Sequence, residues 1–210
     1  MNLEETYRSR LAGVRKYLTD KGLDGALFTS YENRRYYCGF TGSNGYLIVT
    51  DTEAKLITDP RYTAQAQLQT TKDCQVIEYL YDRLGTVAKT VKAMGITALV
   101  LESSLTLDEY LPLKEQLGDM PLHYEQEYFL EQRMVKDAGE IACTKAAIAA
   151  AEAGFDKLLP RLKIGMMASM AEMILNSRRI FATIIIEATW CADGGRATVG
   201  HPGASCRDPA

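Results

Sequence analysis

The sequence predicts an α/β fold in which a mixed β-sheet is flanked by helices on both faces. The alternation of helical and apolar segments, one short connection between two apolar runs and the overall composition support this prediction. Segments with helical periodicity alternate with short apolar runs, and two of these runs are close enough to form an antiparallel hairpin. The composition is that of a globular domain, with 47% apolar and 24% charged residues. The net charge of −3 provides no electrostatic attraction to nucleic acid.

The first predicted element is an amphipathic helix over residues 3–18. Its apolar residues recur every three or four positions: Leu3, Tyr7, Leu11, Val14 and Leu18. Gly22 ends this helix, because glycine readily adopts the conformation found just after a helix C-terminus. The run ALFTS at 26–30 then predicts a strand, and ENRRYYCGF at 32–40 predicts a second helix.

Two strands with a short connection follow. GYLIVT at 45–50 and AKLITD at 54–59 are separated by DTE, which suits an antiparallel hairpin. Pro60 suits the first turn of the next helix, at 61–69, because the N–H that proline lacks would have no partner there. The remaining predicted elements are a strand at 74–80, a helix at 84–94, a strand at 96–103, a helix opened by Thr106 and a short strand at 121–126.

The composition divides the chain into three regions. Alanine-rich residues 138–162 predict a long helix, one face of which is marked by Ile141, Ile148, Phe155 and Leu159. Such a helix needs a partner surface, because packing supplies most of the stability of a helix. The predicted regions are an α/β domain at 1–132, the start of a second domain at 133–166, and an atypical tail at 167–210 with the composition of a frameshifted or disordered segment.

Cysteine usage and apolar run lengths predict the compartment. The cysteines are odd in number and form no C-x-x-C pair: Cys38, Cys74, Cys143, Cys191 and Cys206. They are typical of reduced thiols in a cytosol. The first ten residues lack the apolar core of a signal peptide, and no run approaches the ~18 apolar residues of a membrane span. We therefore expect a cytoplasmic protein that binds neither membrane nor nucleic acid.

The motif GFTGSNG at 39–45 has two interpretations. A phosphate-binding loop is disfavoured, because the motif lacks the lysine of a P-loop and precedes a strand. A turn is favoured, with Gly and Asn supplying positive φ angles. The nearby Arg34 and Arg35 are assigned to a solvated helix face, because nothing around them forms a basic patch.

Other polar residues predict no catalytic or metal site. Ser43 lacks the G-x-S-x-G setting of a nucleophile, and His123 is interpreted as an edge or core histidine. The tail holds several potential ligands: Glu187, Cys191, Asp193, His201, Cys206 and Asp208. They lack the ordered elements and supporting contacts of a metal site, so we predict no catalytic residue and no metal ligand in this chain.

Three blocks in one order resemble the aminopeptidase P, prolidase and creatinase family, and bacterial Xaa-Pro aminopeptidases in particular. They are NRRYYCGFTGSNGYLIVT, LITDPRYTAQA and VKDAGEIACTKAAIAAAEAGFDKLLPRLKIGM. The resemblance implies a creatinase-type N-terminal α/β domain, ribonuclease H-like in shape, followed by the first helix of an incomplete α+β "pita-bread" domain. It also implies a cytosolic, dimeric or tetrameric enzyme that removes the residue before a proline with two divalent metal ions, often manganese.

The resemblance makes Arg61 a candidate substrate-binding residue. In related aminopeptidases the arginine of the TDPRY motif reaches toward the bound peptide, and a guanidinium offers fixed donors to a carboxylate or carbonyl. Phe40, Ser43 and Tyr62 from the same blocks are secondary substrate-binding candidates. In the alternative interpretation, Asp59 and Arg61 only cap and tether the following helix. The sequence leaves both interpretations open.

The chain departs from the family pattern after KIGM at 163–166. The family's metal ligands, two aspartates, a histidine and two glutamates, lie in the catalytic domain beyond this turn. Here MASMAEMILNSRR follows instead. We hypothesise a truncating frameshift near residue 167, which translation of the other reading frames would test. Without the ligands no metal-bound hydroxide forms, so we expect the chain alone not to hydrolyse peptides.

Two other functions stay open at this point. One is a non-catalytic binding or oligomerisation module with the same N-terminal fold. In that case the helix at 138–162 needs a covering partner, and a homodimer is the simplest arrangement. The other is a nucleotide-binding α/β protein, which rests only on the glycines at 39–45.

Overall fold

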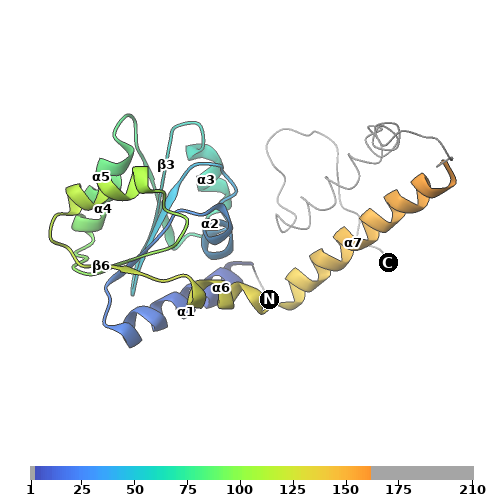
Figure 1. Ribbon diagram of the computed structural model, residues 1–210, viewed down its shortest axis with the longest axis horizontal. Coiled ribbons are helices and arrows are strands. Elements are labelled where there is room, and N and C mark those ends of the chain that lie inside the picture. Colours follow the sequence, from blue (N-terminus) through green and yellow to red (C-terminus); the bar gives the residue numbers. More distant parts are fainter. Residues whose placement is uncertain (1–2, 162–210) are drawn as a thin grey trace. The chain divides into compact units, whose positions relative to one another are not determined.

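The computed structural model describes residues 3–161, which fall into two compact units (Figure 1). The first unit ends at Val135, and the second begins at Lys136. The predictions for the KIGM turn and for the tail lie outside the described residues. Within residues 3–161, no helix combines the length and the apolar character needed to cross a membrane.

The first unit is built on a six-stranded sheet with the order β4-β3-β2-β1-β5-β6. The strands are β1 (Gly25–Phe28), β2 (Tyr46–Thr50), β3 (Ala54–Thr58), β4 (Cys74–Glu78), β5 (Leu99–Leu101) and β6 (Leu122–Tyr124). Strand β2 is antiparallel to both of its neighbours, whereas the other three pairings are parallel. The predicted mixed sheet and its hairpin are therefore confirmed.

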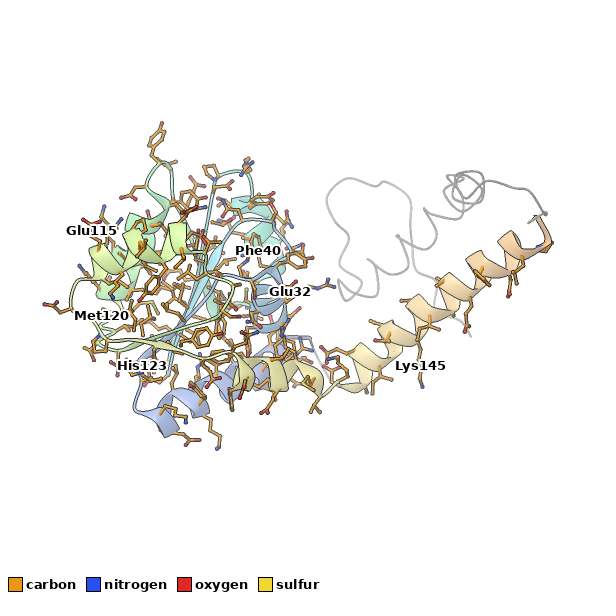
Figure 2. The ribbon with its side chains drawn as sticks, viewed as in Figure 1. Glu32, Phe40, Glu115, Met120, His123 and Lys145 are labelled. Carbon is orange, nitrogen blue, oxygen red and sulfur yellow. The ribbon has the colours of Figure 1, made fainter. Side chains whose placement is uncertain are left out.

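Helices cover both faces of this sheet (Figure 1). One face packs against α1 (Leu3–Lys21), α2 (Tyr31–Cys38), α3 (Thr63–Gln69) and α6 (Glu127–Met134), and the other against α4 (Arg83–Ala93) and α5 (Leu107–Leu117). Successive residues of β1 alternate between the two cores: Phe28 joins the first and Leu27 the second. Side chains fill both layers (Figure 2). Every residue of β2 is buried, as expected of a central strand that is covered on both faces.

Helix α1 confirms the predicted amphipathic opening helix. Leu11, Val14 and Leu18 are buried on its inner side. Gly22 follows the helix with a φ of 64°, as expected of a glycine at this position.

Helix α6 is not predicted by the sequence pattern, because its periodicity is weak. Its buried residue is Phe129, which is 2% exposed. The ring centroid of Phe129 lies 4.8 Å from that of Phe28 and 5.4 Å from that of Tyr17. Contacts with rings from β1 and α1 thus hold this short helix against the core.

The second unit contributes helix α7 (Ala138–Leu158) and a 3₁₀ turn (Leu159–Arg161). A capping box starts the helix: the Asp137 carboxylate accepts the Glu140 N–H at 2.8 Å, and the Glu140 carboxylate accepts the Asp137 N–H at 3.0 Å. The predicted long helix is confirmed over its described part.

Candidate functional site

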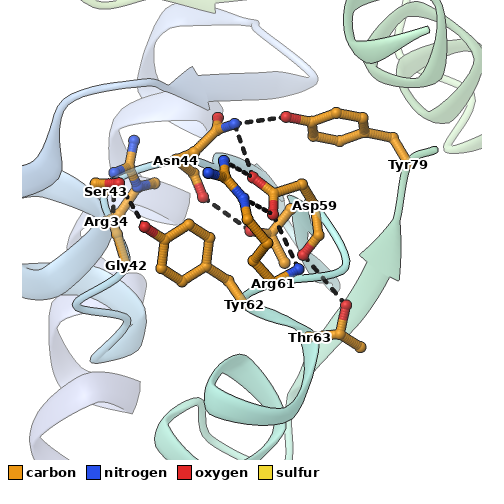
Figure 3. A network of polar contacts seen from close by, with 10 residues as sticks. Arg34, Gly42, Ser43, Asn44, Asp59, Arg61, Tyr62, Thr63 and Tyr79 are labelled. Atoms are coloured by element: carbon orange, nitrogen blue, oxygen red, sulfur yellow. Dashed lines mark hydrogen bonds and ion pairs between the residues drawn. The ribbon is translucent and has the colours of Figure 1, made fainter. Parts of the chain in front are cut away.

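The sequence-predicted residues of the first unit meet at one end of the sheet. Tyr46 at the start of β2 pairs with Ile57 near the end of β3, and Thr58 pairs with Glu78 at the end of β4. This register brings together residues 39–45, which we call the glycine loop, and the turn that follows β3 (Figure 3).

The glycine loop owes its shape mainly to close packing. Only Gly39, at the end of α2, has a positive φ, of 81°. A Cβ atom on Gly42 would lie 2.2 Å from the Phe40 ring, and one on Gly45 would lie 3.1 Å from the same ring. The prediction that Gly and Asn supply positive φ angles is thus wrong for Gly42, Asn44 and Gly45. Gly42 and Gly45 instead let the loop lie directly on the buried Phe40 ring.

Arg34 holds the glycine loop in place from the protein interior. Its side chain donates to the carbonyl oxygens of Thr29, Gly45 (2.8 Å) and Gly42 (2.9 Å). The assignment to a solvated helix face is therefore wrong for Arg34, which is 3% exposed, because the loop folds back over α2. Burial lowers the pKa of Arg34, since the cation loses its hydration there.

Asp59 and Arg61 form a two-pronged ion pair in the turn after β3. Nε of Arg61 donates to Oδ1 at 3.0 Å, and Nη2 donates to Oδ2 at 2.8 Å. The Asp59 side chain is 8% exposed, whereas that of Arg61 is 74% exposed. The hydrogen bond from Arg61 lowers the pKa of Asp59, and the same bond raises the pKa of Arg61. A buried carboxylate thus holds an exposed cation in one orientation.

The ion pair does not cap the helix that follows it. Helix α3 begins after Tyr62, and no side chain hydrogen bond caps its first turn. Asp59 instead accepts the backbone N–H of Arg61 at 3.0 Å, a local turn that delays the helix. Pro60 therefore lies in the turn before α3, and the prediction that it occupies the first helical turn is wrong.

Two side chains of the glycine loop join the turn. Asn44 donates through Nδ2 to Oδ2 of Asp59 at 3.1 Å and to the hydroxyl of Tyr79. The hydroxyl groups of Ser43 and Tyr62 are 2.7 Å apart. The Arg61 guanidinium lies 5.5 Å from the centre of the Tyr62 ring. Figure 3 shows these groups converging around the exposed arginine.

The candidates from the sequence occupy different depths. Arg61, Ser43 and Tyr62 meet at the surface. Phe40 has no exposed area and supports the loop from within. Sequence reasoning missed Asn44 and Tyr79, because only the strand register brings Asn44 to Asp59 and Tyr79 to Asn44.

A second buried carboxylate, Glu102, follows β5 at the same end of the sheet. It is 5% exposed, and among residues 3–161 it accepts hydrogen bonds only from neutral groups. The donors are the N–H and hydroxyl groups of Thr29 and Ser30, the Asn33 amide and the Ser104 hydroxyl. Because these donors occupy its oxygen atoms, Glu102 is a structural anchor for the loop between β1 and α2.

Metal-binding residues are not clustered in the described part of the chain. No group of three or more His, Cys, Asp or Glu side chains in residues 3–161 is placed to hold an ion. His123 is exposed on the edge strand β6, which confirms its interpretation as an edge histidine (Figure 2). Within residues 3–161, Cys38, Cys74 and Cys143 form no disulfide. The potential ligands in the tail lie outside the described residues.

Comparison with known families and sequences gives one consistent result. The Creatinase/Prolidase N-terminal domain family matches residues 10–135. The "Uncharacterized peptidase YqhT" of Bacillus subtilis (strain 168) is 34% identical over 157 residues, which cover 74% of this chain and 44% of that protein. The chain thus spans less than half the length of this relative.

Solved structures agree. An Xaa-Pro dipeptidase from Bacillus anthracis is 29% identical with a TM-score of 0.74, over 80% of this chain and 47% of that chain. An X-Pro aminopeptidase from Thermotoga maritima MSB8 is 29% identical with a TM-score of 0.70, over 79% and 47%. The N-terminal domain of the cytoplasmic peptidase PepQ from Mycobacterium tuberculosis H37Rv is 29% identical with a TM-score of 0.54, over 60% and 98%.

Proposed function

The chain belongs to the Creatinase/Prolidase N-terminal domain family, and on this basis we propose that it is the N-terminal portion of an Xaa-Pro peptidase that presents Arg61 to the peptide. The family reaction removes the residue that precedes a proline. The observation that carries the proposal is the ion pair in which buried Asp59 orients the exposed Arg61 guanidinium. The relatives named as Xaa-Pro dipeptidase and X-Pro aminopeptidase support the substrate class.

The geometry around Arg61 suits recognition of a peptide carboxylate or carbonyl. Asp59 engages Nε and Nη2, so Nη1 is directed away from the ion pair. A guanidinium fixed in this way loses little conformational entropy when it binds an acceptor. Tyr62 and Ser43 place two hydroxyl groups beside it. Together they form a small polar surface that contacts main-chain acceptors of a short peptide.

Peptide binding tests this role directly. The 210-residue chain would be titrated with Ala-Pro while amide signals are followed by NMR. We expect saturable shifts around Arg61, and binding about tenfold weaker or more in Arg61→Met, because a charge-assisted hydrogen bond is lost. The matched control is Arg8→Met, since Arg8 also forms an exposed ion pair, with Asp73 at 2.9 Å. Equal affinity of both variants would contradict the proposal.

We also propose that the chain alone does not hydrolyse Xaa-Pro peptides. The family reaction needs two divalent metal ions, and a bound metal lowers the pKa of water enough to supply hydroxide at neutral pH. The chain covers only 44% and 47% of two relatives, which supports a division of labour between this portion and a catalytic domain. Metal content and turnover of an Xaa-Pro peptide with added manganese test this. Stoichiometric metal together with turnover would overturn it.

The predicted cytoplasmic location and homodimer stay proposals of the same kind. The reduced cysteines Cys38, Cys74 and Cys143, which form no disulfide within residues 3–161, and the "cytoplasmic" relative PepQ support the location. Light scattering of the purified chain tests the dimer. A monomer at micromolar concentration would remove this part of the proposal.

A further inference from the structure

We propose that Arg34, deep beneath the glycine loop, is a positioning residue for Arg61. It holds the loop so that Asn44 and Ser43 fix the Asp59 and Tyr62 side chains on either side of the exposed guanidinium. Its importance for peptide recognition rests on the proposed function of Arg61. Its effect on the orientation of Arg61 is independent of that function.

Arg34 holds the glycine loop through hydrogen bonds to two of its carbonyl groups. Its two terminal nitrogens bind the carbonyl oxygens of Gly42 and Gly45, which flank Ser43 and Asn44 in the chain. A planar guanidinium presents several donors in a fixed fork, so it sets the spacing between these carbonyl groups. A lysine ammonium at the same place would offer donors without that fixed geometry.

Asn44 links the glycine loop to the ion pair of Asp59 and Arg61. Asn44 donates to Asp59, and the Asn44 carbonyl accepts the Thr58 hydroxyl at 2.8 Å. Asn44 is thus held at both its side chain and its backbone. The Asp59 oxygen that accepts from Asn44 also accepts from Nη2 of Arg61, so a shift of the loop changes the environment of this shared oxygen.

Arg34 carries a buried positive charge. Within residues 3–161, its hydrogen bonds go to backbone carbonyl oxygens, and no carboxylate lies within ion-pair distance of it. Burying a cation is costly, and carbonyl oxygens offset part of that cost at Nη1 and Nη2, whereas Nε has no hydrogen-bond partner within residues 3–161. A buried cation with this set of partners is suited to holding loop geometry, since each partner is a backbone group of a loop.

The experiment follows the side-chain Nε–H signal of Arg61 by ¹⁵N NMR in the full chain. In Arg34→Lys we expect this proton to exchange with water about tenfold faster, because the ion pair opens more often. The internal reference is the Nε–H of Arg8, which has a similar partner in Asp73. The matched control variant is Arg35→Lys, the same change one position along α2, which should leave both signals unchanged.

Two results would overturn the proposal. One is an Arg61 signal in Arg34→Lys that equals the wild-type signal. The other is an equal acceleration at Arg8 and Arg61, which would show that Arg34 only stabilises the fold as a whole. Neither result involves peptide binding, so failure of the proposed function would be seen separately in the Ala-Pro titration.

A second variant covers the case in which Arg34→Lys does not fold. Gly42→Ala keeps every donor of Arg34 but places a Cβ atom 2.2 Å from the Phe40 ring, so the loop must shift. We expect the Nε–H proton of Arg61 to exchange faster and the exchange rate of the Arg8 Nε–H proton to stay unchanged. An unchanged Arg61 signal in a folded Gly42→Ala variant would show that the loop does not position the ion pair.

Discussion

Asp59 and Glu102 are buried to a similar degree at the same end of the sheet, 6% and 5% exposed, yet they use their charge differently. Glu102 accepts hydrogen bonds from neutral donors in residues 29–33 and from Ser104, so its charge interacts with groups inside the protein. Asp59 binds an arginine that projects into solvent. The Glu102 carboxylate fixes a loop, whereas the Asp59 carboxylate orients the Arg61 cation.

The difference shows how burial and function separate within one cluster of loops. Each hydrogen bond from a buried neutral donor to a carboxylate stabilises the fold. Removal of the carboxylate leaves those donors without an acceptor. A carboxylate paired with an exposed arginine gains little stability from that pair, because water screens it. Mutation of Glu102 should therefore mainly lower the stability of the fold, whereas mutation of Asp59 should mainly weaken peptide recognition.

The largest expected effect is at Glu102. Glu102→Gln should lower the free energy of unfolding by about 3 kcal/mol, because a buried network loses the negative charge and one of two acceptor oxygens and gains a competing donor. Urea unfolding followed by circular dichroism at 222 nm measures this. Ser104→Ala, which removes only one donor, should cost about 1 kcal/mol. Equal costs for the two variants would refute the anchoring role of Glu102.

A smaller effect is expected at Asp59. Asp59→Asn should lower the free energy of unfolding by about 1 kcal/mol, since Asn44 and the Arg61 backbone N–H lose part of their acceptor. The same variant should release the Arg61 side chain, seen as faster Nε–H exchange. A cost as large as that of Glu102→Gln would remove the contrast between the two carboxylates.

The pH dependence isolates the ionised form of Asp59. Arg61 lowers the pKa of Asp59 in the folded state, so the stabilisation is complete above the unfolded value of about 3.9 and is lost as the pH falls through the lower folded value. The stability gap between wild type and Asp59→Asn should therefore close below about pH 4. Urea titrations at several pH values test this, and a gap that persists at acid pH would contradict it.

The smallest expected effect on stability is at Arg61. Arg61→Met should leave the thermal unfolding midpoint within experimental error, because the side chain is 74% exposed. The Ala-Pro titration of this variant should nevertheless show weakened binding. A marked drop in the unfolding midpoint would mean that Arg61 serves the fold and would weaken its assignment to recognition.

The sequence predicted most elements of the first unit, since periodicity reports directly on which side of a helix or strand is buried. It failed for α6, where Phe129 is the buried residue and the pattern is too short to show a period. It also failed for Arg34. A charged residue beside a glycine-rich turn resembles a solvated one until the turn is folded back over it.

The sequence by itself determined the α/β class, the hairpin, the long helix after residue 137 and the family motif that contains Arg61. These features are local, because each depends on residues within a few turns or strand lengths of one another. Only the tertiary structure decided that Arg34 is buried, that Asn44 reaches Asp59, and that Glu102 binds the donors of residues 29–33, about seventy residues away in the chain. Those contacts depend on strand register, and register is set by the packing of the whole sheet.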